Sequence, residues 1–263
     1  MFFRVSILLL IIMTSSCASR VLVPQTGMDH STGCSDQTRA KAKETYLYAQ
    51  MSSNTYLDRK KFVLPRGYAL EVQNPNDDIG FAYSIYNKRD GSEVKEVIIS
   101  YRGTEGFFSK DMWYGNILAC QNKSGLKLYD EVREKTDKSI PITLIGHSLG
   151  GGIALDVSLK RDNVNTFVFN TSPRFFADKD DVKENNRDSV VEYGEINKLF
   201  RLLGREATQT YTSINCISHG SPVYQHSQRQ LSECLTKIAA IEDEEAKKSL
   251  VDNYLSPNIK CKY

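Results

Sequence analysis

Apolar and polar positions divide the chain into a first part rich in strand patterns and a second part in which strands and helices alternate. Residues 37–56, "QTRAKAKETYLYAQMSSNTY", carry apolar residues at helical spacing and predict a helix. The segments 67–72 and 80–87 alternate apolar and polar residues, and the Asp-Gly pair at 90–91 is a turn signal, so antiparallel strands joined by a hairpin are expected. Residues 94–101 end in a near-continuous apolar run, which is typical of a strand buried on both faces.

From residue 124 onward the patterns predict helices at 124–136, 149–161, 196–203 and about 228–248, and strands at 142–146, 165–170, 189–194 and 212–218. Ser124 is the expected N-cap of the first of these helices. Strands that alternate with helices predict an α/β fold with a mostly parallel central sheet and helices on both faces. A length of 263 residues, 40% of them hydrophobic, suits one globular domain with a sizeable core.

The N-terminus has the pattern of an export signal. "MFFR" supplies a positive charge, and the nine residues "VSILLLIIM" are too few to span a bilayer but fit the apolar part of a secretory signal. The run "TSSC" resembles a bacterial lipobox, in which Cys17 would become the lipid-carrying first residue; an ordinary signal peptide cleaved near Ala18 is the alternative. We therefore expect a lipoprotein signal peptide at 1–16, a lipid-anchored tether at 17–36, a domain at 37–263, and a location on a membrane of the bacterial cell envelope.

Charge and cysteine content exclude some functions. The formal net charge of +2 gives no reason to expect a nucleic-acid partner. None of the cysteines after Cys17 has C-x-x-C spacing, so no metal site is expected. Their odd number predicts that one thiol stays free or pairs elsewhere, while the pairing itself stays open for Cys34, Cys120, Cys216, Cys234 and Cys261.

The segment "ITLIGHSLGGGIALDVSL" places a serine on a tight corner between a strand and a helix. Gly146, Ser148 and Gly150 form the pattern G-x-S-x-G. In this context the serine adopts a strained backbone that projects its hydroxyl from the sheet, and side chains on the flanking glycines would clash. The N–H of Leu149 would then supply half of an oxyanion hole. A phosphate-binding loop is disfavoured because G-K-[ST] is absent.

A second oxyanion donor is expected from the loop that follows the strand ending at Tyr101. The residues "RGT" come next, and Thr104 can offer its backbone N–H while its hydroxyl holds the loop in place.

These motifs together resemble the class 3 lipases and their bacterial relatives. "ISYRGTEG", "LIGHSLGGGIAL" and "FVFNTSPRF" correspond to the oxyanion loop, the elbow and a later turn of that family, although Thr171 stands where glycine is usual. The match covers roughly 94–176. The resemblance implies an α/β-hydrolase fold that cleaves carboxylic esters, often lipid esters, without a metal or organic cofactor. It assigns Ser148 as nucleophile and Thr104 with Leu149 as oxyanion donors.

A serine nucleophile needs a histidine base, and the chain has four histidines. His30 lies in the predicted tether, and the side chain of His147 should diverge from the neighbouring serine. His219 and His226 both follow the last predicted strand, where this fold places its base. The stretch "YQHSQRQLSECL" resembles the "H-S-M…L" stretch of bacterial relatives, which favours His226 and leaves His219 open.

The acid should follow the strand that comes after "FVFNTSPR". Glu195 stands just beyond the predicted strand end, where many relatives have an aspartate. Glu192 lies within the strand and is expected to pack sideways, and Asp188 precedes it at the opposite end of the sheet. Glu195 is therefore the favoured acid, with Glu192 and Asp188 as alternatives.

The sequence thus predicts a lipid-anchored serine hydrolase, a lipase or phospholipase, that forms a covalent acyl-enzyme through Ser148, His226 and Glu195. An acyltransferase or thioesterase with the same triad, and a catalytically silent binding module, are the alternatives. The ester class, the membrane that carries the anchor and the oligomeric state stay open.

Overall fold

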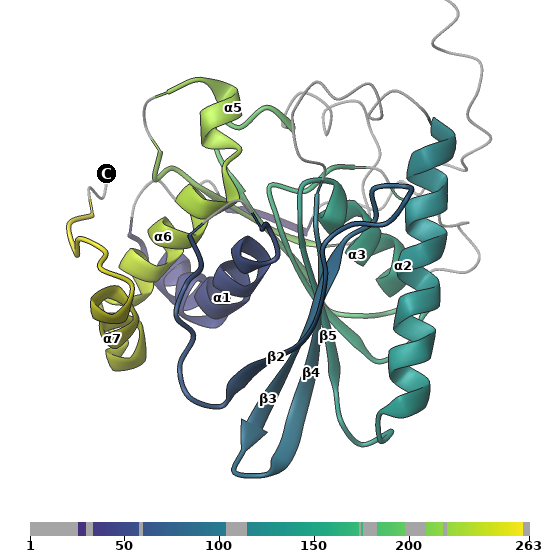
Figure 1. Cartoon of the computed structure of the whole chain (residues 1–263). Helices are drawn as coiled ribbons and strands as arrows, with labels where there is room; N and C mark the ends of the chain where they lie inside the picture. The colour runs from purple at the N-terminus through teal and green to yellow at the C-terminus, as the bar shows by residue number, and fades with distance from the viewer. Residues whose placement is uncertain are drawn as a thin grey trace, which may run out of the picture.

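The chain folds around one β-sheet with helices packed against both of its faces (Figure 1). The computed structural model describes residues 26–29, 34–57, 60–103, 115–173, 175, 183–197, 209–217 and 220–259. The helix predicted at 196–203 lies outside these residues, apart from its first two positions.

The sheet has eight strands in the order β1-β8-β7-β6-β5-β4-β3-β2. Their bounds are β1 Thr26–Asp29, β2 Tyr68–Asn74, β3 Tyr83–Asp90, β4 Glu93–Tyr101, β5 Ile142–His147, β6 Val164–Phe169, β7 Arg187–Glu192 and β8 Thr210–Ile214. Along this order, every pair of neighbours from β1 at one edge to β4 is parallel. The last two strands, β3 and β2, pair antiparallel and form the other edge. The mostly parallel sheet predicted from the alternating pattern is confirmed.

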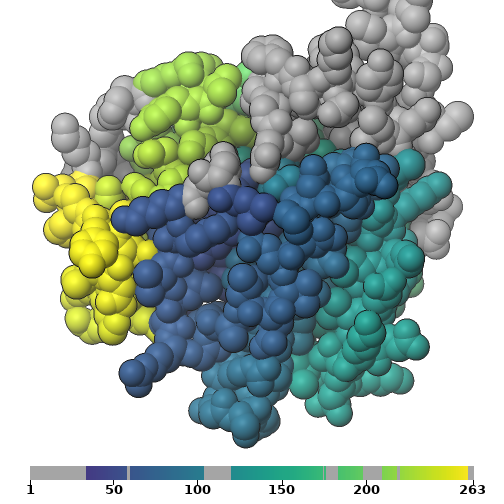
Figure 2. All heavy atoms as spheres, in the orientation of Figure 1, coloured from purple at the N-terminus to yellow at the C-terminus, as the bar shows by residue number. Residues whose placement is uncertain are grey.

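The helices are α1 Asp36–Asn54, α2 Gly115–Lys135, α3 Leu149–Lys160, α5 Pro222–Gln225, α6 Gln228–Ala239 and α7 Glu244–Asp252. α1, α6 and α7 cover one face of the sheet, and α2 and α3 cover the other (Figure 1). In the space-filling view the α1 and α7 segments lie on one side of the molecule and α2 on the other (Figure 2). The predicted arrangement, with helices on both faces, is therefore confirmed.

The central strands are apolar on both faces because each face has its own core. On β4, Ile98 packs into the core beneath α1 and α6, while its neighbour Ile99 packs into the core beneath α3. On β5, Ile145 packs into the core beneath α1 and α6, and Leu144 packs into the core beneath α3. Successive side chains of a strand point to opposite faces, so a strand covered on both sides appears in the sequence as a continuous apolar run.

The hairpin predicted at 90–91 joins β3 and β4. Gly91 has φ +57°, in the left-handed region that a tight turn requires and glycine adopts at no steric cost.

The helix predicted to begin at Ser124 is longer than expected, because α2 already begins at Gly115. The Ser-Gly pair at 124–125 therefore lies inside the helix, and the N-cap assignment was wrong. A Cβ at Gly125 would collide with the side chain of Ile153 on α3, and the Tyr101 hydroxyl donates to the Gly125 carbonyl at 2.9 Å. The glycine serves close packing and does not mark a helix end.

The single helix predicted from about 228 to 248 is two helices, α6 and α7. Asp243 begins the second one, because its side chain accepts from the backbone N–H of Ala246 at 2.8 Å. Glu244 and Glu245 follow in the first turn, where the helix dipole favours negative charge. These signals define a new N-terminus within a segment whose apolar pattern looked continuous.

The predicted tether at 17–36 contains a strand. β1 pairs in parallel with β8 at the edge of the sheet, so this part of the segment belongs to the sheet. Edge pairing uses backbone groups and leaves little trace in a polar, turn-rich sequence. Cys17 lies outside the described residues. No helix within the described part of the chain is long and apolar enough to cross a membrane.

Candidate active site

The corner between β5 and α3 has the backbone geometry predicted for a nucleophile elbow. Ser148 has φ 55° and ψ −124°, a conformation that residues with a side chain rarely adopt. A Cβ on Gly146 would collide with the backbone of Gly150, and a Cβ on Gly150 would collide with the carbonyl of Tyr101. The two glycines of G-x-S-x-G are therefore required by backbone contacts on both sides of the serine.

Hydrogen bonds hold the elbow in this conformation. The N–H of Ser148 donates to the Phe169 carbonyl at 3.1 Å, and the Ser148 carbonyl accepts from Ser172 at 2.9 Å and from Gly152 at 3.2 Å. Thr171 is buried, and a Cβ on Gly151 would lie 2.6 Å from its hydroxyl oxygen. The turn after β6 thus packs directly on the elbow, and Gly151 makes room for the side chain of Thr171.

Two backbone N–H groups were predicted to face the serine. Leu149 is the first residue of α3, where an amide has no partner within the helix. Thr104 lies outside the described residues, but Gly103, directly before it, approaches the elbow: a Cβ there would lie 3.0 Å from the Cβ of Ser148. The described end of the loop after β4 therefore lies beside Ser148.

A buried histidine and a buried carboxylate meet beside the elbow. The Nδ1 atom of His226 lies 2.6 Å from Oε2 of Glu195, with the two residues 7% and 2% exposed. Glu195 lies in the loop after β7, and His226 caps the C-terminal end of the short helix α5. The N–H of Asn197 donates to the same Oε2 atom at 2.8 Å, which fixes the carboxylate.

A hydrogen-bond chain ties His226 to the elbow. Nε2 of His147 lies 2.8 Å from the His226 carbonyl, which can only accept, so Nε2 carries the proton and Nδ1 is an acceptor. The Tyr56 hydroxyl donates to that Nδ1 at 2.7 Å and accepts from the N–H of Gly103 at 3.2 Å. The sequence did not predict the role of Tyr56, because no local motif marks it.

The remaining candidates are engaged elsewhere or lie outside the described residues. Asp188 forms an ion pair with Lys41 at 2.6 Å, toward the amino end of β7. Glu192 accepts from the N–H groups of Cys216 at 3.2 Å and Ile217 at 3.0 Å. Burial raises the pKa of Glu192 to about 7. His219 lies outside the described residues.

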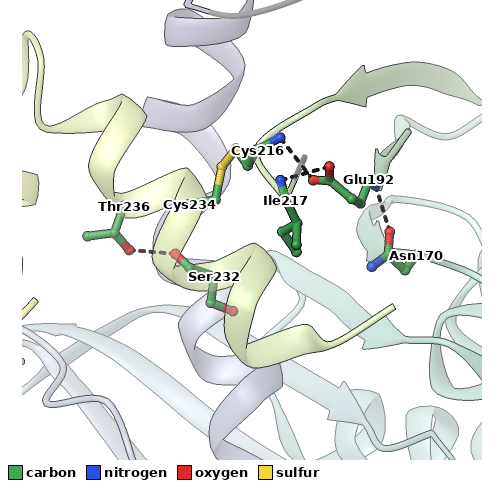
Figure 3. The surroundings of a disulfide bond; sticks show 7 residues. All are labelled: Asn170, Glu192, Cys216, Ile217, Ser232, Cys234 and Thr236. Atoms are coloured by element: carbon green, nitrogen blue, oxygen red, sulfur yellow. Dashed lines mark hydrogen bonds between the residues drawn. A yellow bond between two sulfur atoms is a disulfide. The ribbon is translucent and has the colours of Figure 1, made fainter. Parts of the chain in front are cut away.

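A disulfide closes the segment that carries His226. Cys216 follows β8 and is bonded to Cys234 in α6, 18 positions later (Figure 3). Figure 3 shows the Glu192 carboxylate directed at the amides of Cys216 and Ile217, at the start of this segment. Cys34 is disulfide-bonded as well, and Cys120 is the free, exposed cysteine of the described residues, consistent with the odd count.

Solved structures similar to this chain include fungal lipases. A lipase from Rhizopus microsporus var. chinensis is 12% identical, with a TM-score of 0.50 over 74% of this chain and 81% of that one. The triacylglyceride lipase of Rhizomucor miehei is 14% identical, with a TM-score of 0.48 over 68% and 82%. A triacylglycerol lipase from Penicillium expansum is 13% identical, with a TM-score of 0.47 over 66% and 80%.

No protein-family model matches the sequence, and no curated protein matches it. At this identity the likeness shows the fold alone, which is an α/β-hydrolase fold of the lipase type. The order of the strands and the elbow after β5 agree with that class.

The described residues contain no group of three or more His, Cys, Asp and Glu side chains that could hold a metal ion. What the site does contain is a half-buried serine on a strained corner, a buried histidine–carboxylate pair anchored to that corner, and the N-terminus of a helix directly after the serine. These groups are suited to nucleophilic chemistry at a carbonyl.

Proposed function

We propose that the chain is a serine hydrolase of carboxylic esters, with Ser148 as nucleophile, His226 as base and Glu195 as the acid that orients the base. The observation that supports this most directly is the 2.6 Å contact between His226 Nδ1 and Glu195 Oε2, next to a serine held at positive φ. A buried carboxylate on Nδ1 selects the tautomer in which Nε2 is the proton acceptor.

In the proposed reaction His226 Nε2 accepts the Ser148 hydroxyl proton as the serine oxygen bonds to the ester carbon. The carbonyl oxygen gains the negative charge and accepts hydrogen bonds from the N–H groups of Leu149 and Thr104. Collapse of this intermediate breaks the bond to the alcohol oxygen, which takes the proton from His226. Water then repeats the sequence on the acyl-enzyme and releases the acid.

The proposed substrates are lipid esters, of the triglyceride or phospholipid class. Two supports exist: the sequence resemblance to class 3 lipases, and the similar structure from Rhizopus microsporus var. chinensis, which is called a lipase. An acyltransferase with the same triad would pass the acyl group to an acceptor other than water. A thioesterase would release a thiol in place of an alcohol.

The test uses purified protein and a fluorophosphonate probe, which forms a bond only with an activated serine. We expect wild type to be labelled, Ser148→Ala to be unlabelled, and His226→Ala to label about 10³-fold more slowly or worse. Hydrolysis of p-nitrophenyl butyrate should follow the same order. A folded wild type that does not react would contradict the hydrolase and favour the silent binding module.

We also propose that the chain is exported and anchored through Cys17 in the bacterial cell envelope. The disulfide between Cys216 and Cys234 supports export, because disulfides persist in oxidising compartments. Cells fed a radiolabelled fatty acid should incorporate label into wild type and not into Cys17→Ala. Equal incorporation by both would rule out this anchor.

A further inference from the structure

Asn170 occupies the point where the segments of the proposed triad converge. It directly follows β6, its exposed fraction is 0%, and its φ is 43°, which places it in the left-handed region. Asparagine tolerates that region better than most residues with side chains. The position therefore combines a turn conformation with complete burial, and a buried amide needs hydrogen-bond partners.

All four polar groups of Asn170 have partners. The side-chain Oδ1 accepts from the N–H of Glu192 at 2.8 Å, a contact visible in Figure 3, and Nδ2 donates to the Gln225 carbonyl at 3.3 Å. Its backbone N–H donates to Val190 at 3.0 Å, and its carbonyl accepts from Nδ2 of Asn197 at 3.0 Å. One residue thus holds the end of β7, the loop beyond it and the end of α5.

Two of these partners are one step from a proposed catalytic group. Asn197 donates through its backbone to the Glu195 carboxylate, and Gln225 precedes His226. On the other side of Asn170, Ser172 donates to the Ser148 carbonyl. The turn at 170–172 consequently contacts the serine, acid and base segments, which are far apart in the sequence.

We propose that Asn170 is a positioning residue that holds the acid and base loops in register with the nucleophile elbow. This inference rests on the hydrolase proposed above. The side-chain amide fixes the end of α5 and the end of β7 relative to each other, so the His226–Glu195 pair keeps its place beside Ser148. Misplacement of reacting groups by about 1 Å can cost about 100-fold in rate.

Two substitutions separate the contacts. Asn170→Gly fits φ 43° and removes both side-chain hydrogen bonds. Asn170→Asp keeps an oxygen for the Glu192 N–H but places a second oxygen against the Gln225 carbonyl, so it selectively breaks the link to the base segment.

Asn185 offers a matched control at the other end of β6. Its Nδ2 donates to the carbonyls of Ser158 and Arg161 at 2.6 Å each, and its Oδ1 accepts from Val164 at 3.0 Å. Asn185→Ala removes a comparable bridge without touching the proposed site.

For each variant the experiment measures the rate of fluorophosphonate labelling and the final fraction of the protein that is labelled. It also measures KM for p-nitrophenyl butyrate, and kcat calculated per labelled site. We expect both Asn170 variants to lose about 10- to 100-fold in labelling rate and kcat, with KM changed little. For Asn185→Ala, only the stability and the final labelled fraction should fall. Its kcat per labelled site should be unchanged.

An Asn170→Asp or Asn170→Gly protein with wild-type kcat per labelled site overturns the inference and leaves the hydrolase intact. A drop confined to the final labelled fraction also overturns it, because that pattern means a structural role. If wild type itself does not label, the proposed function and this inference fail together.

Discussion

The Nε2 atom of His147 donates to the backbone carbonyl of His226 at 2.8 Å, between residues 79 positions apart in the chain. The two imidazole rings lie with centroids 4.7 Å apart. The residue next to the proposed nucleophile therefore holds the main chain of the proposed base. Through Tyr56 the same imidazole is connected to Gly103, on the loop that leads to Thr104.

Tyr56→Phe tests this connection. The substitution leaves the Gly103 N–H and His147 Nδ1 without the hydroxyl, in a buried site. We expect the free energy of unfolding to fall by about 1–3 kcal/mol, the usual cost of an unsatisfied buried polar group. Urea unfolding measures this, and fluorophosphonate labelling should slow as the proposed oxyanion loop loses its anchor. Tyr254→Phe, at an 88% exposed position, should change neither quantity.

Glu195→Gln keeps the shape of the proposed acid but removes its charge. The imidazolium that forms on His226 during the reaction would lose its counter-charge, and the amide could present its N–H₂ to Nδ1. We expect kcat to fall by about 10³- to 10⁴-fold with little change in KM, measured with p-nitrophenyl butyrate. Asp188→Asn is the control, because Asp188 is paired with Lys41 instead. Equal losses in both variants would argue against Glu195 as the acid.

Gly150→Ala should disrupt the elbow. The added Cβ would collide with the Tyr101 carbonyl, which belongs to a central strand and cannot move freely. Overpacking of this kind costs about 3 kcal/mol, so we expect a lowered melting temperature and loss of labelling. Gly91→Ala adds a Cβ with nothing within 4 Å, and its cost should come only from φ +57°. Thermal unfolding of the two variants compares a packing clash with a conformational cost.

Replacing both Cys216 and Cys234 by serine opens the 18-position segment that carries His226. Loop-closure entropy predicts a loss of about 3 kcal/mol in the free energy of unfolding. Labelling should also slow, because the base segment gains freedom. Cys120→Ser removes the free, exposed thiol and should leave both quantities unchanged. Unaltered stability of the double variant in urea would show that the disulfide contributes nothing.

Glu192 makes stability depend on pH. Burial raises its pKa from 4.5 to about 7, so the folded state binds this proton more tightly than the unfolded state does. The stability it contributes is fully present below about pH 4.5 and is lost as the pH rises through about 7. Relative to Glu192→Gln, wild type should therefore lose unfolding free energy across that window in urea titrations.

Glu71→Gln provides a control of opposite sign for this pH dependence. A hydrogen bond from Arg89 lowers the pKa of Glu71, so its small contribution grows as the pH rises. If the free energy of unfolding changed with pH in the same way for wild type and for Glu192→Gln, the interpretation of Glu192 as a buried acid would be contradicted.

Local sequence predicted much of the fold. The apolar runs of β4, β5 and β6, the turn at Gly91 and the strand–elbow–helix around Ser148 all arise from neighbouring residues and are found where the pattern placed them. Helix ends were less predictable, because the glycine at 125 reflects packing against Ile153 and the break before α7 depends on one capping aspartate.

The sequence by itself determined a mostly parallel α/β domain, a serine on a strained corner and a short list of acids and histidines. Only the tertiary structure decided that Glu195 meets His226, that Tyr56 and Asn170 join the surrounding network, and that β1 completes the sheet edge. The physical reason is distance along the chain. Strand and turn preferences act over a few residues, whereas these contacts depend on which loops the sheet order brings to the same edge.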